Sequence, residues 1–311
     1  MIDLHTHLWE HGPGPLRVER ARLEDYCDQA SARGVMTIAV TEHLERFREV
    51  RPILDRAWDD DPRPELRGFM DRVFDEEQGA DLDDYVFGLR QAQADGLPIR
   101  IGVEFGWWPG RVEALAAVVA EHQFDVVLGS VHHIGAWMFD AYDDPAVAAE
   151  WERSDPERVW ETYTEAVEDL AASGVCDVLA HVDLVKLTGT RPDRMPEFYD
   201  RMADAAAAND LAVEVSSAGL RKPVNEIYPA AAVLPRLRER DVPVTLASDA
   251  HRAADVAVGN ADLRRQLAAA GYDSVATYRR RQREPVRLPS TTPTSGGDPA
   301  ADTHPDGGSL A

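Results

Sequence analysis

Short apolar stretches alternate along this chain with segments whose apolar residues recur every three or four positions. The apolar stretches predict strands, and we place seven, at residues 2–7, 35–41, 99–103, 125–131, 177–180, 211–215 and 242–247. The periodic segments predict helices, as with Leu23, Tyr26 and Ala30 ahead of Gly34. Strands that alternate with amphipathic helices are typical of a parallel sheet covered by helices. Seven such units favour a single distorted (β/α)7 barrel over an open sheet.

Two segments depart from this alternation. Residues 46–80 are charged and proline-bearing, with a helical piece around Glu65–Phe74, and they predict an insertion or lid over one face. From Pro289 onward the chain is rich in Ser, Thr, Pro, Gly and Asp, which predicts a disordered tail. We therefore expect a barrel domain over residues 1–288, with an insertion at about 46–80, followed by a tail at 289–311.

The charge and cysteine content restrict the partners and the compartment. With 56 acidic and 33 basic residues the net charge is −23, which repels nucleic-acid backbones and anionic membranes. No run of about 18 apolar residues predicts a membrane span, and the first residues lack the basic region of a signal peptide. Cys27 and Cys176 lie in apolar, periodic contexts that indicate buried thiols, which is typical of a cytoplasmic protein. The oligomeric state is left open.

Histidines and carboxylates gather where the predicted strands end. His5 and His7 are two positions apart on the first strand, so their side chains point to the same side. The carboxyl ends of parallel barrel strands meet at one rim, which is where active sites are built. Six of the ten histidines fall at these ends. The chemistry-bearing residues there are His5, His7, Glu42, His43, Glu104, His132, His181, Asp249 and His251.

Such a rim needs positive charge. Clustered carboxylates and imidazoles with no cations nearby are stabilised most simply by bound metal ions. Nitrogen and oxygen ligands without thiolates suit Zn, Mn or Fe rather than a cysteine-rich structural zinc site. The sequence therefore predicts an active site with divalent metal ions at the carboxyl ends of the strands.

Taken in order, these motifs resemble the PHP (polymerase and histidinol phosphatase) superfamily, from about Met1 to Gly271. The chain is most similar to the PHP-type histidinol-phosphatases. That likeness rests on Gly-Ser-Val-His at 129–132, His-Val-Asp-Leu at 181–184, Ser-Ala-Gly-Leu-Arg-Lys-Pro at 217–223 and Ser-Asp-Ala-His-Arg-Ala-Ala-Asp-Val at 248–256.

The resemblance implies a (β/α)7 barrel with two or three divalent ions. It implies a first ion held by His5, His7, Glu104 and Asp249, and a second held by Glu104, His132 and His181. A third would be held by His43 and His251, together with a histidine of the first loop. The family places that histidine six residues after the His-x-His pair, where this chain has Pro13, so His11 is the candidate here. Relatives also often have Asn where Ser216 stands.

Other roles follow from the same likeness and from general chemistry. A metal-bridging water would be the nucleophile, and the expected catalytic residues are Asp249, His251, Glu42 and Arg221. Arg221 can hold two phosphate oxygens in a fork, with Lys222 and Lys186 as further substrate contacts. Glu42 could orient a ligand or shuttle a proton, and both roles stay open. Three tryptophans just after strand ends could wall the substrate pocket: Trp107, Trp108 and Trp137.

Three hypotheses of function follow. The preferred one is a phosphomonoesterase acting on a small phosphorylated substrate, with L-histidinol phosphate suggested by the family. The second is a PHP phosphoesterase acting on nucleotides or oligonucleotides, which the net charge of −23 disfavours. The third is a barrel that binds metal without catalysis and serves as a binding subunit, which a missing ligand would favour.

Overall fold

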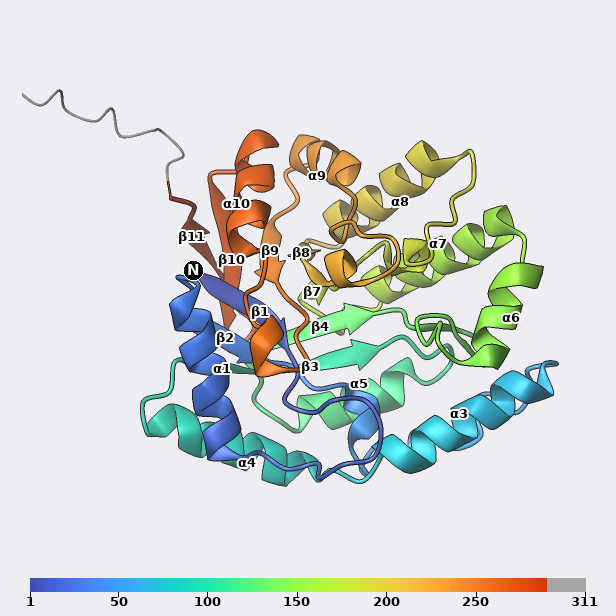
Figure 1. Ribbon diagram of the computed structural model, residues 1–311, viewed down its shortest axis with the longest axis horizontal. Helices are drawn as coiled ribbons and strands as arrows, with labels where there is room; N and C mark the ends of the chain where they lie inside the picture. The colour runs from blue at the N-terminus through green and yellow to red at the C-terminus, as the bar shows by residue number, and fades with distance from the viewer. Residues whose placement is uncertain (290–311) are drawn as a thin grey trace, which may run out of the picture.

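The computed structural model describes residues 1–289 and contains one sheet of seven parallel strands. Its outer strands meet, because Thr6 and Ala250 form a parallel bridge and the Asp249 amide donates to the His5 carbonyl at 2.9 Å. The sheet is thus a nearly closed barrel, which confirms the predicted fold class (Figure 1). In sheet order its strands are β1 (Ile2–Thr6), β2 (Thr37–Val40), β3 (Ile99–Gly106), β4 (Val126–Ser130), β7 (Val178–Leu179), β8 (Ala212–Ser216) and β9 (Val244–Ala247).

Helices surround this barrel, with their buried apolar faces turned toward the strands (Figure 1). The larger apolar core lies between the strands and these helices. The helices are α1 (Arg20–Ala32), α2 (Arg51–Leu54), α3 (Pro64–Glu77), α4 (Leu82–Ala94), α5 (Val112–Ala120), α6 (Pro145–Arg153), α7 (Pro156–Ala172), α8 (Met195–Ala208), α9 (Leu234–Glu239) and α10 (Asn260–Ala269).

A second, smaller apolar cluster combines strand residues with two residues from a C-terminal hairpin. The hairpin pairs β10 (Ser274–Arg279) with β11 (Gln282–Arg287), and it contributes Ala276 and Tyr278. The Tyr278 hydroxyl donates to the Asp177 carbonyl at 3.0 Å, just before β7 begins. The hairpin therefore packs at the amino ends of the strands, opposite the predicted active site. The other residues of the cluster lie in the barrel strands or, for Ala180, directly after one: Ile2, Leu4, Ala39, Val126, Leu128, Val178, Ala180 and Ala212.

This hairpin was not predicted, because β11 lacks the pattern of a core strand. Most of its residues are exposed, it is rich in charge, and it includes Pro285. Pro in a strand is tolerated at an edge, where its missing N–H costs no ladder hydrogen bond. Helix α6 and the short hairpin of β5 (His133–Ile134) and β6 (Trp137–Met138) were also not predicted.

The charged segment at 46–80 folds against the carboxyl ends of the strands. Its main element, α3, includes the predicted helical piece at 65–74 and buries Leu66, Phe69, Met70 and Phe74. Arg63, just before α3, pairs with Glu150 at 2.8 Å and donates to the Ile134 carbonyl at 3.0 Å. In Figure 1, β3 and β4 point toward the side of the molecule where α3 and α6 lie. That residues 46–80 are an insertion stays a prediction.

Three expectations about the whole chain can be placed against the structure. Within residues 1–289, no helix is long and apolar enough to cross a membrane. Cys27 and Cys176 are free thiols, with Cys176 buried and Cys27 partly buried. The predicted tail lies outside the described residues, apart from Pro289 at its start.

Candidate active site

The carboxyl ends of the barrel strands bring the predicted ligands together. His5 and His7 come from β1 and the residue after it, and their Nε2 atoms lie 2.9 Å apart. The register of β1 against β2 shifts between Asp3 and Thr6, an irregularity that commonly re-aims side chains beside active sites. The two histidines therefore share one side, as their spacing predicted.

Glu104, at the carboxyl end of β3, is the centre of this cluster and is fully buried. Its Oε1 lies 2.9 Å from His132 Nε2 and 3.1 Å from His181 Nε2. Its Oε2 lies 2.8 Å from His43 Nδ1 and 3.3 Å from His5 Nε2. One carboxylate thus contacts imidazoles delivered by four different strands.

Asp249 completes the cluster from the turn after β9. Its backbone has φ of 50°, in the left-handed region that non-glycine residues rarely adopt and that functional sites often contain. Its Oδ1 lies 3.4 Å from His7 Nε2 and 3.7 Å from both His5 Nε2 and His251 Nδ1. The closure of the barrel between β9 and β1 therefore places this carboxylate beside both first-strand histidines.

The electrostatics of the cluster favour ionised carboxylates. Burial opposes ionisation of Glu104, yet the imidazoles of His43, His5 and His132 outweigh it and hold its pKa well below the usual value. Burial likewise opposes ionisation of Asp249, and neighbouring imidazoles hold its pKa well below the ordinary range. Among residues 1–289, every ion pair to Glu104 comes from a histidine, so no arginine or lysine balances this charge.

The donor atoms fit divalent metal ions. Buried atoms without a hydrogen-bond partner include His43 Nε2, His251 Nε2 and Glu104 Oε2, which a bound cation would satisfy. Sets of three ligand atoms within 4.8 Å of one another are drawn from the residues expected for the ions, although none joins His132 to His181 and none contains His11. These sets are His5–Glu104–His181, His43–Glu104–His132, His5–His7–Asp249 and His7–His43–His251.

Carboxylates behind the cluster fix the orientation of its imidazoles. Glu214 Oε2 accepts from His5 Nδ1 at 2.8 Å, and Asp140 Oδ2 accepts from His132 Nδ1 at 2.7 Å. With Nδ1 bound in this way, Nε2 of each ring faces the cluster and is free to bind metal. Sequence reasoning missed both carboxylates. Glu214 could have been found as the one charged residue within the apolar strand 211–215, whereas nothing in the pattern singled out Asp140.

Glu42 also lies behind the cluster, and its place argues against the catalytic role assigned to it. It is fully buried and does not line the cavity. Its Oε1 accepts from the Leu8 and Trp9 amides, and its Oε2 lies 3.6 Å from His7 Nδ1. Of the two roles left open, the structure supports orientation of His7 and of the first loop, because a proton shuttle needs contact with the substrate.

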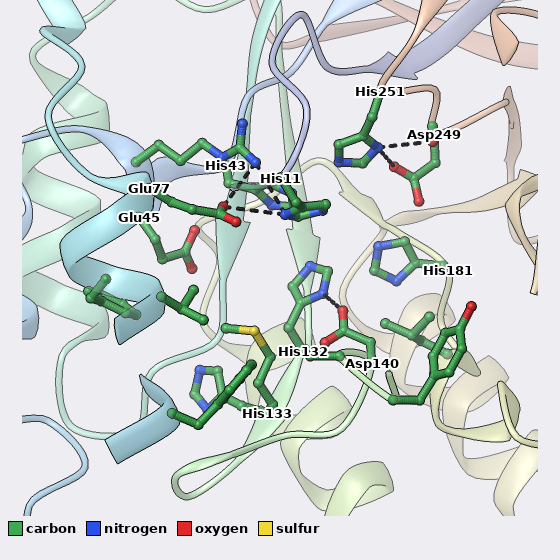
Figure 2. A pocket seen from close by; sticks show the side chains of 18 of the residues that line it. His11, His43, Glu45, Glu77, His132, His133, Asp140, His181, Asp249 and His251 are labelled. Atoms are coloured by element: carbon green, nitrogen blue, oxygen red, sulfur yellow. Dashed lines mark hydrogen bonds and ion pairs between the residues drawn. The ribbon is translucent and has the colours of Figure 1, made fainter. Parts of the chain in front are cut away.

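His11 joins the cluster although it precedes the position used by relatives. Its ring stacks on that of His251 at 4.6 Å between centroids, and 62% of its side chain is exposed. Its Nδ1 lies 3.3 Å from Glu77 Oε2 (Figure 2) and 3.2 Å from Arg46 Nη2. Helix α3, which supplies Glu77, therefore helps to hold the first loop against the proposed third ion site.

A cavity of about 370 Å³ opens beside the cluster, within the range of small-molecule sites. Figure 2 shows the imidazoles of His132, His181 and His251 around it, with Glu45 and Glu77 on the α3 side. Trp108 lines the cavity as predicted, while Trp107 and Trp137 are not part of its lining. The apolar wall consists of Phe69, Val73, Phe74, Trp108, Met138, Ala141 and Leu184.

Two of the predicted substrate contacts lie at or near this cavity. Lys222 lines it, with Nζ 5.7 Å from the centre of the Tyr142 ring. Arg221 is exposed and is not part of the lining, and its Nη2 donates to the carbonyls of Ser248 at 2.6 Å and Asp249 at 3.1 Å. Arg221 thus contacts the backbone of the Asp249 turn, and a phosphate contact remains a prediction.

The third substrate contact, Lys186, was predicted wrongly. Its side chain is fully buried, and Nζ pairs with Asp183 at 2.9 Å and donates to the Ile227 carbonyl at 2.7 Å. It lies 5.1 Å from the centre of the Tyr228 ring, and it is Tyr228 rather than Lys186 that lines the cavity. A 3-10 turn at Leu184–Lys186 points this ammonium into the protein interior, which the sequence did not reveal.

Replacing Lys186 with alanine should therefore act on stability. We expect the free energy of unfolding to fall by about 3 kcal/mol, because Asp183 would keep a buried charge without a partner. Urea unfolding followed by circular dichroism measures this. Lys222→Ala, at the only other lysine, is the control and should change the same quantity by less than about 0.5 kcal/mol. A stable Lys186→Ala protein with strongly reduced kcat/KM would restore the substrate role.

Comparison with known proteins agrees with this geometry. Residues 16–218 match the PHP domain family. A protein of Deinococcus radiodurans described as a probable histidinol-phosphatase is 31% identical over 283 residues, 91% of this chain and 97% of the relative. A protein of Schizosaccharomyces pombe with the same description is 24% identical over 263 residues, 80% of each chain.

Among solved structures, the fold is similar to that of a histidinol phosphate phosphatase from Lactococcus lactis. That structure was determined in complex with zinc, L-histidinol and phosphate. The TM-score is 0.68 at 20% sequence identity, and the alignment covers 91% of this chain and 98% of the other. The barrel, the order of the motifs and these matches lead to one conclusion: this chain belongs to the PHP domain family.

Proposed function

We propose that the protein is a metal-dependent phosphatase that hydrolyses L-histidinol phosphate to L-histidinol and phosphate, a reaction of histidine biosynthesis. The main support is the cluster at the strand ends, where two carboxylates and six imidazoles come together beside the cavity. Among residues 1–289, no arginine or lysine forms an ion pair with either of these carboxylates. The relative from Deinococcus radiodurans, aligned over 97% of its length, supports the choice of substrate.

Two or three divalent ions, of Zn, Mn or Fe, are the proposed cofactors. Bound ions would supply a hydroxide nucleophile near neutral pH and neutralise charge on the phosphate. His5, His7, Glu104 and Asp249 would hold one ion, and His132 and His181 would hold a second together with Glu104. His43 and His251 would hold a third, with His11 beside them.

The remaining groups position the substrate and protect the reaction. Glu214 and Asp140 hold the imidazoles of His5 and His132 in one orientation, so that no reorganisation is needed during turnover. The apolar wall from α3 limits water around the reacting phosphate. Lys222 and Arg221 are the proposed cationic contacts for phosphate oxygens. The free thiols Cys27 and Cys176 support a cytoplasmic location.

Two alternatives are distinguishable from this proposal. A nucleotide-directed phosphoesterase has to attract substrates of higher negative charge, which a net charge of −23 opposes. A binding subunit without catalysis would be favoured by loss of ligands. The contacts of Glu104 with His5, His132 and His181 support the catalytic proposal instead.

The test compares kcat/KM for L-histidinol phosphate, a nucleoside 5′-monophosphate and a nucleoside 3′,5′-bisphosphate at two salt concentrations. We expect L-histidinol phosphate to be preferred by at least about tenfold at both, since one lost charge contact is typically worth this much. A clear preference for either nucleotide at both salt concentrations would contradict the substrate assignment and leave a phosphoesterase. Absence of phosphate release from all three would favour the binding subunit.

A further inference from the structure

One carboxylate on the cavity wall has no cationic partner. Glu45 lies on the short turn Leu44–Arg46, and it lines the cavity on the α3 side (Figure 2). Its Oε1 accepts a hydrogen bond from Trp108 Nε1 at 2.9 Å. Within residues 1–289, no ion pair reaches Glu45 and no hydrogen bond reaches its Oε2. This second oxygen is thus available to a ligand in the cavity.

Three of the other four cavity carboxylates have partners. Asp140 is bound by His132 at 2.7 Å, Glu77 by Arg46 at 3.0 Å, and Asp249 belongs to the metal-binding cluster. Asp143 is exposed to solvent at the edge of the cavity. Among the cavity carboxylates that are shielded from solvent, Glu45 is therefore the one available to a cation.

The surrounding fold fixes the position of the Glu45 carboxylate. Trp108 is only 3% exposed, and its ring packs against Phe74 at 5.6 Å and His133 at 3.9 Å between centroids, which fixes the direction of its N–H. At the end of β3, a Cβ on Gly106 would overlap Oε1 of Glu45. The carboxylate therefore occupies space that exists because residue 106 has no side chain.

The surroundings of Glu45 would strengthen its attraction for a cation. Phe69, Val73 and Phe74 of α3 line the same cavity, and an apolar wall lowers the local dielectric and enhances charge interactions. The metal ligands His132 and His181 line that cavity as well. A small ester whose phosphate lies at the metal ligands can therefore present its organic end to Glu45.

We propose that Glu45 is a specificity-determining residue that binds the cationic organic end of the substrate, a protonated amine or imidazole. This inference rests on the proposed function, and it names the group that separates amino-bearing phosphate esters from neutral ones. Glu45 Oε2 would accept a hydrogen bond from the cation while Oε1 keeps its bond to Trp108.

The test uses the metal-loaded full chain and a ratio of two kcat/KM values. The numerator is measured with L-histidinol phosphate, and the denominator with p-nitrophenyl phosphate, whose organic part is neutral. Glu45→Gln keeps the shape and removes the charge, so the ratio should fall roughly tenfold or more, as for loss of a hydrogen bond to a charged group. Glu76→Gln is the matched control, because Glu76 is exposed on α3 and does not line the cavity. Its ratio should equal that of the wild type.

Two further substrates identify the cation. Phosphoethanolamine carries an ammonium and no ring, and 3-(imidazol-4-yl)propyl phosphate carries the ring and no amine. A lowered ratio in Glu45→Gln for either of them, relative to p-nitrophenyl phosphate, supports the proposal and names the group bound. Equal losses on every ester, or an unchanged ratio for L-histidinol phosphate, would overturn it.

A double-mutant cycle of Gly106→Ala and Glu45→Ala tests whether the glycine leaves the space that the Glu45 carboxylate occupies. Gly106→Ala should lower the ratio in the wild-type background, because the new methyl group displaces Glu45. It should leave the ratio unchanged in a Glu45→Ala background, where no carboxylate remains to be displaced. An equal effect in both backgrounds would contradict the proposed position of the Glu45 carboxylate.

A wild-type protein inactive on L-histidinol phosphate would refute the proposed function itself, whereas an active wild type with an unaltered Glu45→Gln ratio refutes only this inference.

Discussion

Replacing Glu104 with alanine should lower the phosphatase activity by at least roughly 10³-fold and remove most of the bound metal. Both carboxylate oxygens contact imidazoles, Oε1 at His132 and His181 and Oε2 at His43 and His5. Among residues 1–289, no other carboxylate pairs with both His43 and His132. Phosphate release and metal content per chain, by elemental analysis, measure the two effects.

The controls for this experiment separate chemistry from folding. Glu104→Gln keeps the size of the side chain and should show the same loss of metal, while far-ultraviolet circular dichroism should match the wild type. Glu113→Ala removes an exposed carboxylate from α5 and should retain both activity and metal. Full activity in metal-free Glu104→Ala protein would end the proposal of metal-dependent catalysis.

Replacing Arg221 with alanine should lower kcat/KM for L-histidinol phosphate by roughly 10²-fold, since loss of a charged transition-state contact typically costs about 3 kcal/mol. Its guanidinium bonds the carbonyls of Ser248 and Asp249 through Nη2 alone, so its other nitrogens can serve a phosphate at the rim. Arg221→Lys should recover only part of the activity, because an ammonium cannot form the bidentate fork.

Metal content decides between two explanations of such a loss. A phosphate contact predicts unchanged metal content in Arg221→Ala, whereas a residue that only holds the Asp249 turn predicts weaker metal binding. Arg252→Ala is the control, because Arg252 is an exposed arginine beside His251 whose ion pair among residues 1–289 is with Asp255. A decrease of less than about threefold in kcat/KM would contradict the phosphate contact.

Residues at strand ends made this site predictable from sequence. Parallel barrel strands all finish at one rim, so His5, Glu104 and Asp249 had to meet once the strands were assigned. The proposed metal ligands follow from that single geometric rule together with residue type. The position of His11 could be anticipated only as the nearest histidine in the loop, and its contacts with Glu77 and Arg46 needed the folded α3.

What the sequence concealed depends on contacts between distant segments. Asp140 lies 8 residues from His132 in the sequence, and Glu214 lies 209 residues from His5. No periodic pattern marks such pairs. Lys186 lies five residues after the strand-end residue His181, yet a local turn directs it to Asp183 in the interior. The hairpin β10–β11 was missed because an exposed, charged edge strand lacks the apolar alternation from which strands are predicted.

The central claim is that divalent ions at the rim and the imidazole–carboxylate cluster together hydrolyse a phosphate monoester. The most direct measurement removes metal from the purified full chain with a chelator and then restores it stepwise, following phosphate release from L-histidinol phosphate. We predict that activity disappears in the metal-free protein and returns in proportion to bound metal, reaching its maximum at two or three ions per chain. Phosphate release by metal-free protein, or saturation with metal that restores no activity, would contradict the account.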